Sequence, residues 1–233
     1  MVKITSRVLS KEKVLRHFFK DKELDELRRG IVTEIKPFLD SIRKMDKESA
    51  SVKQFNKALD VFNQRIYGGM EIYGYIMKDL STDRSSRYDT KEEIRVLLAY
   101  LGLVESLGNT VTDVVVMSLV SNGRDFHIES PYVTPRIRRV VAIEDLETHR
   151  VSLTTKLNFL RDNGISVFPS VVDSELGNII AHLKFEIRKN EVYIRGKPSL
   201  VTVMVAWFKL FEAITTVEGL LEAMQKRAAL SLY

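Results

Sequence analysis

The chain has 233 residues, of which 45% are hydrophobic and 29% charged, so it can form one large domain or two small ones. It contains no cysteine, which excludes disulfides, thiolate catalysis and cysteine-ligated zinc. The net charge is +5, and the excess is N-terminal: residues 1–88 carry 19 Lys and Arg against 13 Asp and Glu, and the remainder carries 17 against 18. This excess permits contact with nucleic-acid phosphates, although a solvated helical surface explains it equally well.

Two apolar runs, Val111–Val120 and Val201–Ile214, are the strongest hydrophobic features of the chain. Both are shorter than the ~20 residues that a membrane span requires, so we expect buried helices. The N-terminus lacks the apolar core of a signal peptide. The sequence therefore favours a cytoplasmic location.

Three helices are expected in the N-terminal part. Ser10 is a candidate N-cap for the first, which begins with KEKVLRHFFK. Apolar residues at helical spacing predict a second helix over residues 24–42, which Pro37 should end or kink. A third is expected over residues 52–77, with a kink or a close helix crossing at Gly68-Gly69.

The polar segment Ser81–Asp89 is the clearest linker in the chain. We therefore expect an N-terminal helical arm of residues 1–82 and a second domain of residues 89–233.

The second domain should begin with a long helix. Thr90 and Glu93 have the spacing of a capping box, and apolar residues continue the helical pattern to about Leu119. Gly102 and Gly108 would permit close helix packing, either within the chain or across a dimer.

An irregular insert of residues 124–144 follows, after a helix stop at Ser121-Asn122-Gly123. Residues 140–143 have the character of a strand. The insert carries a basic cluster that could hold phosphate, formed by Arg124, Arg136, Arg138 and Arg139. A solvated edge or a set of ion pairs is the alternative.

A further helix should start at Asp145 or Thr148, include Leu153, and end at Asn163-Gly164.

The C-terminal third predicts a short helix, a β-hairpin and a long helix. Ser170 and Asp173 resemble a capping box for the short helix. The hairpin arms are residues 185–187 and 192–194, and the last helix spans residues 201–228. With so few strand segments, the expected fold class is all-α with a small β-hairpin.

Common catalytic signatures are absent from the sequence, including the P-loop and the H-E-x-x-H zinc motif. The four histidines are far apart and show no metal-binding spacing. We therefore expect neither a metal nor another cofactor.

His182 is the residue that best fits a chemical role. Asn178 and Glu175 lie about one and two helical turns before it, so all three share one face beside an apolar stripe. The amide could orient the imidazole, and the carboxylate would favour its charged form. The alternative is a boundary histidine that stops the helix or fixes the hairpin.

The N-x-x-A-H run from Asn178 to His182, followed by the hairpin, resembles the signature of the HEPN family, R-N-x-x-x-H. The resemblance covers roughly residues 89–230 and implies a HEPN-like helical bundle. In active HEPN ribonucleases the His transfers protons and the Arg stabilises phosphate charge on RNA, without a metal. The resemblance also implies a homodimer in which two such helices form one cleft.

The chain departs from the family motif at the arginine. The three positions that the family spacing allows hold Glu175, Leu176 and Gly177. Glu175 would repel a phosphate where a cation is required, which indicates weak or absent catalysis. Arg136 or Arg138 could replace the missing cation in space.

Three hypotheses follow. The first is a dimeric HEPN-like protein that binds RNA or a protein partner, in a defence or toxin–antitoxin system. The second is a metal-independent endoribonuclease that uses His182 with a relocated arginine. The third is a structural module whose N-terminal helices drive assembly.

Overall fold

The computed structural model describes residues 21–82, 90–129, 137–148, 151–189 and 191–230, and the helix expected after Ser10 lies outside them. The elements are α2 (Asp21–Lys44), α3 (Ala50–Thr82), α4 (Thr90–Leu103), the π-helical turn η1 (Val104–Gly108), α5 (Asn109–Ser121), β1 (His127–Glu129), β2 (Ile137–Arg139), α6 (Ile143–Thr148), α7 (Leu153–Asp162), α8 (Val167–Val171), α9 (Ser174–Ala181), β3 (Glu186–Arg188), β4 (Glu191–Ile194), β5 (Lys197–Pro198) and α10 (Ser199–Leu230). The fold is all-α with two small antiparallel sheets, and the predicted fold class is confirmed.

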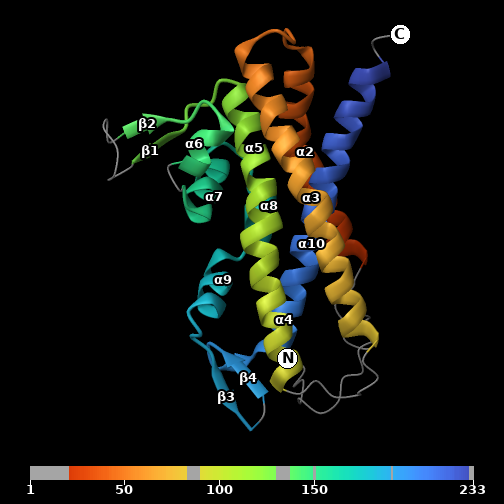
Figure 1. Cartoon of the computed structure of the whole chain (residues 1–233), viewed down its shortest axis with the longest axis vertical. Coiled ribbons are helices and arrows are strands. Elements are labelled where there is room, and N and C mark those ends of the chain that lie inside the picture. Colours follow the sequence, from red (N-terminus) through yellow and green to blue (C-terminus); the bar gives the residue numbers. More distant parts are fainter. Residues whose placement is uncertain (1–20, 83–89, 130–136, 149–150, 190, 231–233) are drawn as a thin grey trace.

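Elements α4, η1 and α5 form one continuous helix, from Thr90 to Ser121, through the middle of the molecule (Figure 1). Every residue from 110 to 119, in its second half, is buried, and the run Val114–Met117 is apolar on all sides. By length and composition alone this helix could cross a membrane, but most of it is buried inside the protein. A helix that is hydrophobic all round is typical of a core, so the predicted buried helix is confirmed.

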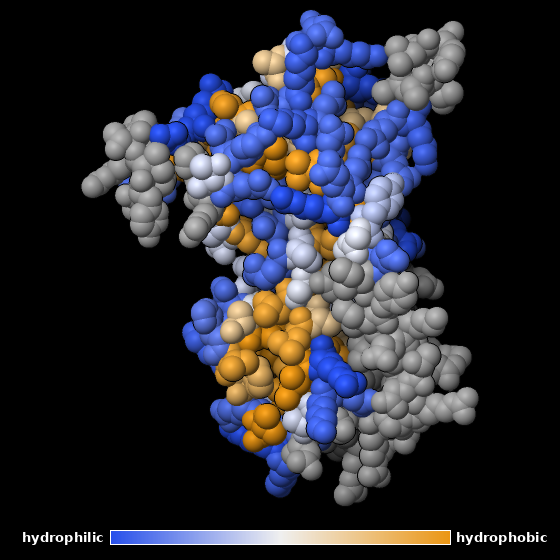
Figure 2. Space-filling model, in the orientation of Figure 1, coloured by the Kyte–Doolittle hydropathy of each residue, from blue (hydrophilic) through white to orange (hydrophobic). Residues whose placement is uncertain are grey.

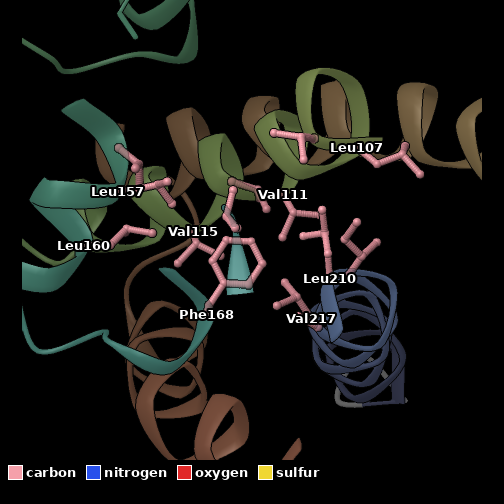
Figure 3. Close-up of a cluster of buried hydrophobic side chains, with 14 of the residues drawn as sticks. Leu107, Val111, Val115, Leu157, Leu160, Phe168, Leu210 and Val217 are labelled. Atoms are coloured by element: carbon pink, nitrogen blue, oxygen red, sulfur yellow. The ribbon is translucent and has the colours of Figure 1, made fainter. Parts of the chain in front are cut away.

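A single hydrophobic core joins the helices. Figure 3 shows the central helix meeting α7, α8 and α10 in a cluster that includes Leu107, Val111, Val115, Leu157, Leu160, Phe168, Leu210 and Val217. Helices α2 and α3 add Ile31, Ile35, Phe55 and Phe62 to the same core. The expected arm of residues 1–82 therefore shares its core with residues 89–233, and its deletion would expose buried apolar surface on α5 and α10.

The sequence predicted that Pro37 would either end or kink this helix. Helix α2 does not end there, but continues to Lys44. A proline removes the hydrogen bond to the carbonyl four residues earlier, which is that of Thr33. Both Pro37 and Thr33 are exposed, so water can bind the freed carbonyl and the helix tolerates the loss.

The glycine pair in α3 marks a close helix crossing, as predicted. A Cβ atom at Gly69 would overlap the side chain of Leu107 in η1, whose Cγ would lie only 3.0 Å away. Nothing lies within 4 Å of the same position at Gly68. One glycine of the pair is therefore required by packing.

Both predicted glycine stops are confirmed. Helix α5 ends at Ser121 with Asn122 as its C-cap, and Gly123 has φ +81°. Helix α7 ends at Asp162 with Asn163 as its C-cap, and Gly164 has φ +83°. These left-handed conformations suit glycine, because it has no Cβ.

The insert after α5 contains a hairpin of β1 and β2, and the strand predicted at residues 140–143 is wrong. The strand is Ile137–Arg139, and α6 follows it. The carboxylate of Asp145 accepts hydrogen bonds from the N–H groups of Val141, at 2.8 Å, and Ala142, at 2.9 Å. This side-chain cap turns the β-branched segment into the start of a helix.

The helix expected to run from Asp145 or Thr148 through Leu153 is also wrong, because two helices, α6 and α7, occupy this stretch. The hydroxyl of Ser152 accepts a hydrogen bond from the N–H of Thr155 at 3.1 Å. This N-cap starts α7 at Leu153.

An ion pair lies within the core between α5 and α7. Lys156 Nζ is 2.5 Å from a carboxylate oxygen of Asp113, and the two side chains are only 4% and 7% exposed. The ammonium also donates to Asn109 Oδ1 at 2.9 Å. Burial raises the pKa of Asp113, although Lys156 opposes that shift.

Candidate functional site

Helix α9 carries the residues that the sequence singled out. The side chain of Asp173 accepts a hydrogen bond from the N–H of Leu176 at 2.7 Å, which makes Asp173 the N-cap of α9. The capping box predicted for Ser170 and Asp173 is wrong, because Ser170 lies in α8, where its hydroxyl donates to the carbonyl of Val167. The helix ends at Ala181, and the N–H of His182 still donates to the carbonyl of Asn178 at 3.0 Å. Leu183 then takes a left-handed conformation, with φ +52°, and turns the chain towards β3.

The three predicted catalytic residues, Glu175, Asn178 and His182, are all exposed. Leu176, Gly177 and Ile180 form the opposite, buried face of α9. At a rise of 1.5 Å per residue, His182 lies about 6 Å along the axis from Asn178 and about 10 Å from Glu175. The helix thus presents these groups to solvent as one row.

Gly177, one of the positions at which the family motif has its arginine, faces away from this row. A Cβ atom at Gly177 would lie 3.6 Å from Val104 Cγ1 and 3.9 Å from Leu101 Cδ1 of the central helix. Leu176 is buried as well. A guanidinium at either position would start from the buried side of α9, so Glu175 is the only one of the three allowed positions that is exposed.

Arg195 supplies a cation on the exposed face, and sequence reasoning missed it. It lies in the turn between β4 and β5, and its guanidinium forms an ion pair with Glu175. Arg195 and Gly196 both have positive φ, +53° and +74°, as a two-residue hairpin turn requires. The Arg-Gly dipeptide before a short strand was the signal that could have located this turn.

The segment from α9 to β5 is strongly basic. Between residues 184 and 197 there are five basic and two acidic side chains, a local excess of three positive charges: Lys184, Arg188, Lys189, Arg195 and Lys197 against Glu186 and Glu191. All five basic residues are exposed. The guanidinium of Arg188 lies 5.7 Å from the ring centre of Tyr193, and it also pairs with Glu186. Cations and an aromatic face therefore occur together on this hairpin.

A buried carboxylate attaches the hairpin to the central helix. Glu93 accepts a hydrogen bond from the N–H of Val192 at 2.7 Å. Burial raises the pKa of the Glu93 carboxyl, and the bond from Val192 opposes the shift. The capping box predicted at Thr90 and Glu93 does not include this contact, which joins residues 99 positions apart in sequence.

The predicted basic cluster of the insert lies elsewhere. Figure 1 shows the β1–β2 hairpin beside α6, well separated along the long axis from α9 and the β3–β4 hairpin. Arg139 forms an ion pair with Asp125 at 2.5 Å, and Arg138 is half-buried on β2. Arg136 lies outside the described residues, and Arg124 is exposed. Within the described chain, Arg138 is thus not the cation on the His182 face.

Comparisons of the chain with known protein families, curated proteins and solved structures find no match.

Proposed function

We propose that this chain is a HEPN-like RNA-binding protein that contacts RNA with the end of α9 and the following hairpin, and that it is catalytically weak or inactive. The observation that supports the proposal is the excess of exposed cations between residues 184 and 197, next to Asn178 and His182. Lysine and arginine side chains bind phosphate without regard to sequence. Tyr193, beside Arg188, would offer a base a face for stacking.

The same geometry argues against strong catalysis by one subunit. The guanidinium of Arg195 is held at Glu175, about 10 Å along the helix axis from His182. Its charge is also neutralised by that carboxylate. A proton-transfer group and a phosphate clamp must act on one phosphate, so this separation favours binding over cleavage.

The proposal is tested by titrating fluorescent single-stranded RNA with the full chain. Replacing Lys189 and Lys197 by glutamate should raise the dissociation constant roughly tenfold or more, because cation–phosphate contacts are lost. The matched control replaces Lys47, between α2 and α3, and Lys53, in the first turn of α3, by glutamate, which makes the same change in net charge. The connection between α2 and α3 lies at the opposite end of the molecule from the β3–β4 hairpin (Figure 1).

Equal weakening by the two double variants would mean unspecific attraction and would reject the site. No RNA binding by the wild type would reject RNA as the ligand. Binding of a protein partner would then remain as the prediction for the ligand. The defence or toxin–antitoxin setting that the family resemblance implies would also remain a prediction.

A metal-independent endoribonuclease is a second candidate, because Arg195 shares the exposed face of α9 with His182. In this alternative Arg195 leaves Glu175 and binds the phosphate, and His182 accepts the proton of the 2′-hydroxyl. The 2′-oxygen then bonds to phosphorus as the bond from phosphorus to the 5′-oxygen breaks, which leaves a 2′,3′-cyclic phosphate and a 5′-hydroxyl that takes its proton from water or the imidazolium. Labelled RNA is incubated with the wild type, His182→Ala and Arg195→Ala in EDTA, with Lys53→Ala as control. Cleavage that both site variants lose, and the control keeps, supports this candidate; cleavage that is absent or independent of His182 rejects it.

A further inference from the structure

Three aliphatic side chains near the β3–β4 hairpin have no role in the proposed RNA contact. Leu98 on α4, Leu183 at the end of α9 and Ile187 on β3 are 53%, 68% and 54% exposed. They are three of the six large hydrophobic residues that are exposed in the described part of the chain. Single exposed aliphatic residues are common, but a group of them marks an interaction site. We call these three residues the apolar face.

The residues of the apolar face belong to one area of the surface. Helix α4 packs against both α9 and β4. Ile187 is paired with Val192, whose N–H donates to Glu93 of α4, and residues paired across two strands project from the same side of a sheet. Ile187 therefore lies on the α4 side of the hairpin, although only Val192 is buried there. Figure 2 shows the apolar area that extends over α4, α9 and the hairpin.

A cation lies close in sequence to each residue of the apolar face. Lys184 and Arg188 directly follow the aliphatic residues of α9 and β3, and Arg95 precedes that of α4 by three residues, which is about one helical turn. All three cations are exposed. The segment of residues 184–197 also carries the excess of three positive charges described above. The apolar face therefore has positive surroundings.

A second pair of exposed aliphatic residues lacks such surroundings. Ile137 on β2 and Val141 just after it are 63% and 53% exposed. Residues 124–145 contain four arginines and four acidic residues, so this part of the chain has no net charge. The pair matches the apolar face in exposure and differs from it in charge, which makes it a control.

The positive surroundings select an occupant with negative charge, and the aliphatic side chains select one with hydrocarbon. Residues 1–20 contain six basic residues and one acidic residue, so the cations would repel this segment. A second copy of the chain would set the same cations against one another. RNA supplies phosphates but no hydrocarbon that could cover three exposed aliphatic side chains.

We propose that the apolar face and its cations form a docking site for the surface of an anionic phospholipid membrane. The aliphatic side chains enter the boundary between headgroups and acyl chains, and the cations bind the anionic headgroups. A protein partner would need a pocket for each of three side chains from three separate segments, whereas a lipid leaflet deforms around them. The proposal does not rest on RNA binding, because the apolar face has no role in the RNA contact.

The first test measures binding of the full chain to vesicles by flotation on a density gradient. The wild type should bind vesicles of phosphatidylcholine with about 30% phosphatidylserine, and should bind phosphatidylcholine alone at least about tenfold more weakly. The double variant Leu183→Ser with Ile187→Ser keeps every charge and should bind the anionic vesicles at least about tenfold more weakly than the wild type. Ile137→Ser with Val141→Ser is the matched control and should bind like the wild type. Circular dichroism checks that both variants are folded.

Three outcomes of this test overturn the proposal. If the wild type does not bind the anionic vesicles, lipid is not the occupant, and an acidic protein segment takes its place as the hypothesis. If neutral and anionic vesicles bind equally well, the cations have no part in the contact. If the two double variants lose binding to the same extent, the contact is not at the apolar face.

A second test locates the contact and uses the absence of cysteine from the sequence. Leu98→Cys, Leu183→Cys and Ile187→Cys are each labelled with an environment-sensitive fluorophore. Anionic vesicles should shift the emission of all three labels to shorter wavelength, and lipids with brominated acyl chains should quench it. A label at Ile137→Cys should show neither effect. Labels that stay in water at the three positions of the apolar face, or that respond equally at Ile137→Cys, overturn the proposal.

Discussion

Two of the ion pairs that join separate elements differ in their surroundings and in what they do. Lys156 and Asp113 are buried between α5 and α7, where Asn109 accepts a further hydrogen bond from the ammonium. Arg195 and Glu175 are exposed, 53% and 76%, at the edge of α9. Residue type alone therefore does not identify a binding site. The Lys156–Asp113 pair is buried in the core and cannot reach a ligand, whereas the exposed guanidinium of Arg195 can leave Glu175 and bind a ligand.

The largest expected effect breaks the buried pair. Lys156→Ala leaves the Asp113 carboxylate in the core without a compensating charge, which should lower the free energy of unfolding by about 3–5 kcal/mol. Urea denaturation followed by circular dichroism measures the change. The double variant Lys156→Met with Asp113→Leu removes both charges and should recover most of the loss. A loss below about 1 kcal/mol for Lys156→Ala would mean that water reaches the pair.

A smaller effect is expected at the glycine pair of α3. Gly69→Ala places a methyl group against Leu107 and should destabilise the fold by about 1–3 kcal/mol, which outweighs the gain in helix propensity. Gly68→Ala meets nothing within 4 Å and should stabilise the fold by up to about 1 kcal/mol. Thermal melting should show a lower Tm than the wild type for Gly69→Ala and a higher Tm for Gly68→Ala. Shifts of the same sign would contradict the crossing at Gly69.

The attachment of the hairpin should depend on pH through Glu93. Burial raises the pKa of this carboxyl in the folded protein above its unfolded value, so the folded state binds its proton more readily. The Glu93 contribution to stability should therefore fall as the pH rises from the unfolded pKa through the folded one. Comparing the wild type with Glu93→Gln between about pH 4 and pH 7 isolates this contribution. If the free energy of unfolding of the wild type rose with pH relative to that of Glu93→Gln, the sign would be reversed and the burial of the carboxylate would be contradicted.

The smallest effect on stability is expected from the exposed pair. Arg195→Ala should change the free energy of unfolding by less than about 0.5 kcal/mol, because water screens an ion pair at this exposure. The same variant should weaken RNA binding measurably, since one phosphate contact is lost. If Arg195→Ala lowered the free energy of unfolding as much as Lys156→Ala does, the exposed and the buried ion pair would not differ in their contribution to stability.

Local signals in the sequence predicted most of the helices. The two Asn-Gly stops act within a few residues of the helix ends that they set, so their chemistry is readable in the sequence. The apolar periodicity of α2 and α3 likewise predicted which side chains are buried. Capping by Asp145 and Ser152 was missed because the same residues also occur in loops.

The partners across the fold could not be predicted. Lys156 meets Asp113 from 43 residues away, and Val192 meets Glu93 from 99 residues away. No local pattern encodes such pairs, because they depend on how the helices pack. For the same reason the candidate cation beside α9 was sought in the insert, at Arg136 and Arg138, while Arg195 of the hairpin occupies that face.

The central claim, that the end of α9 and its hairpin form the RNA contact, is tested most directly by photo-crosslinking. RNA that contains 4-thiouridine is crosslinked to the full-length protein, and the attached peptides are mapped by mass spectrometry. The expected result is crosslinks within residues 174–197, with Tyr193 among the attached residues. Crosslinks confined to the arginines of the insert, at residues 124–139, or to the N-terminal helices would contradict the claim.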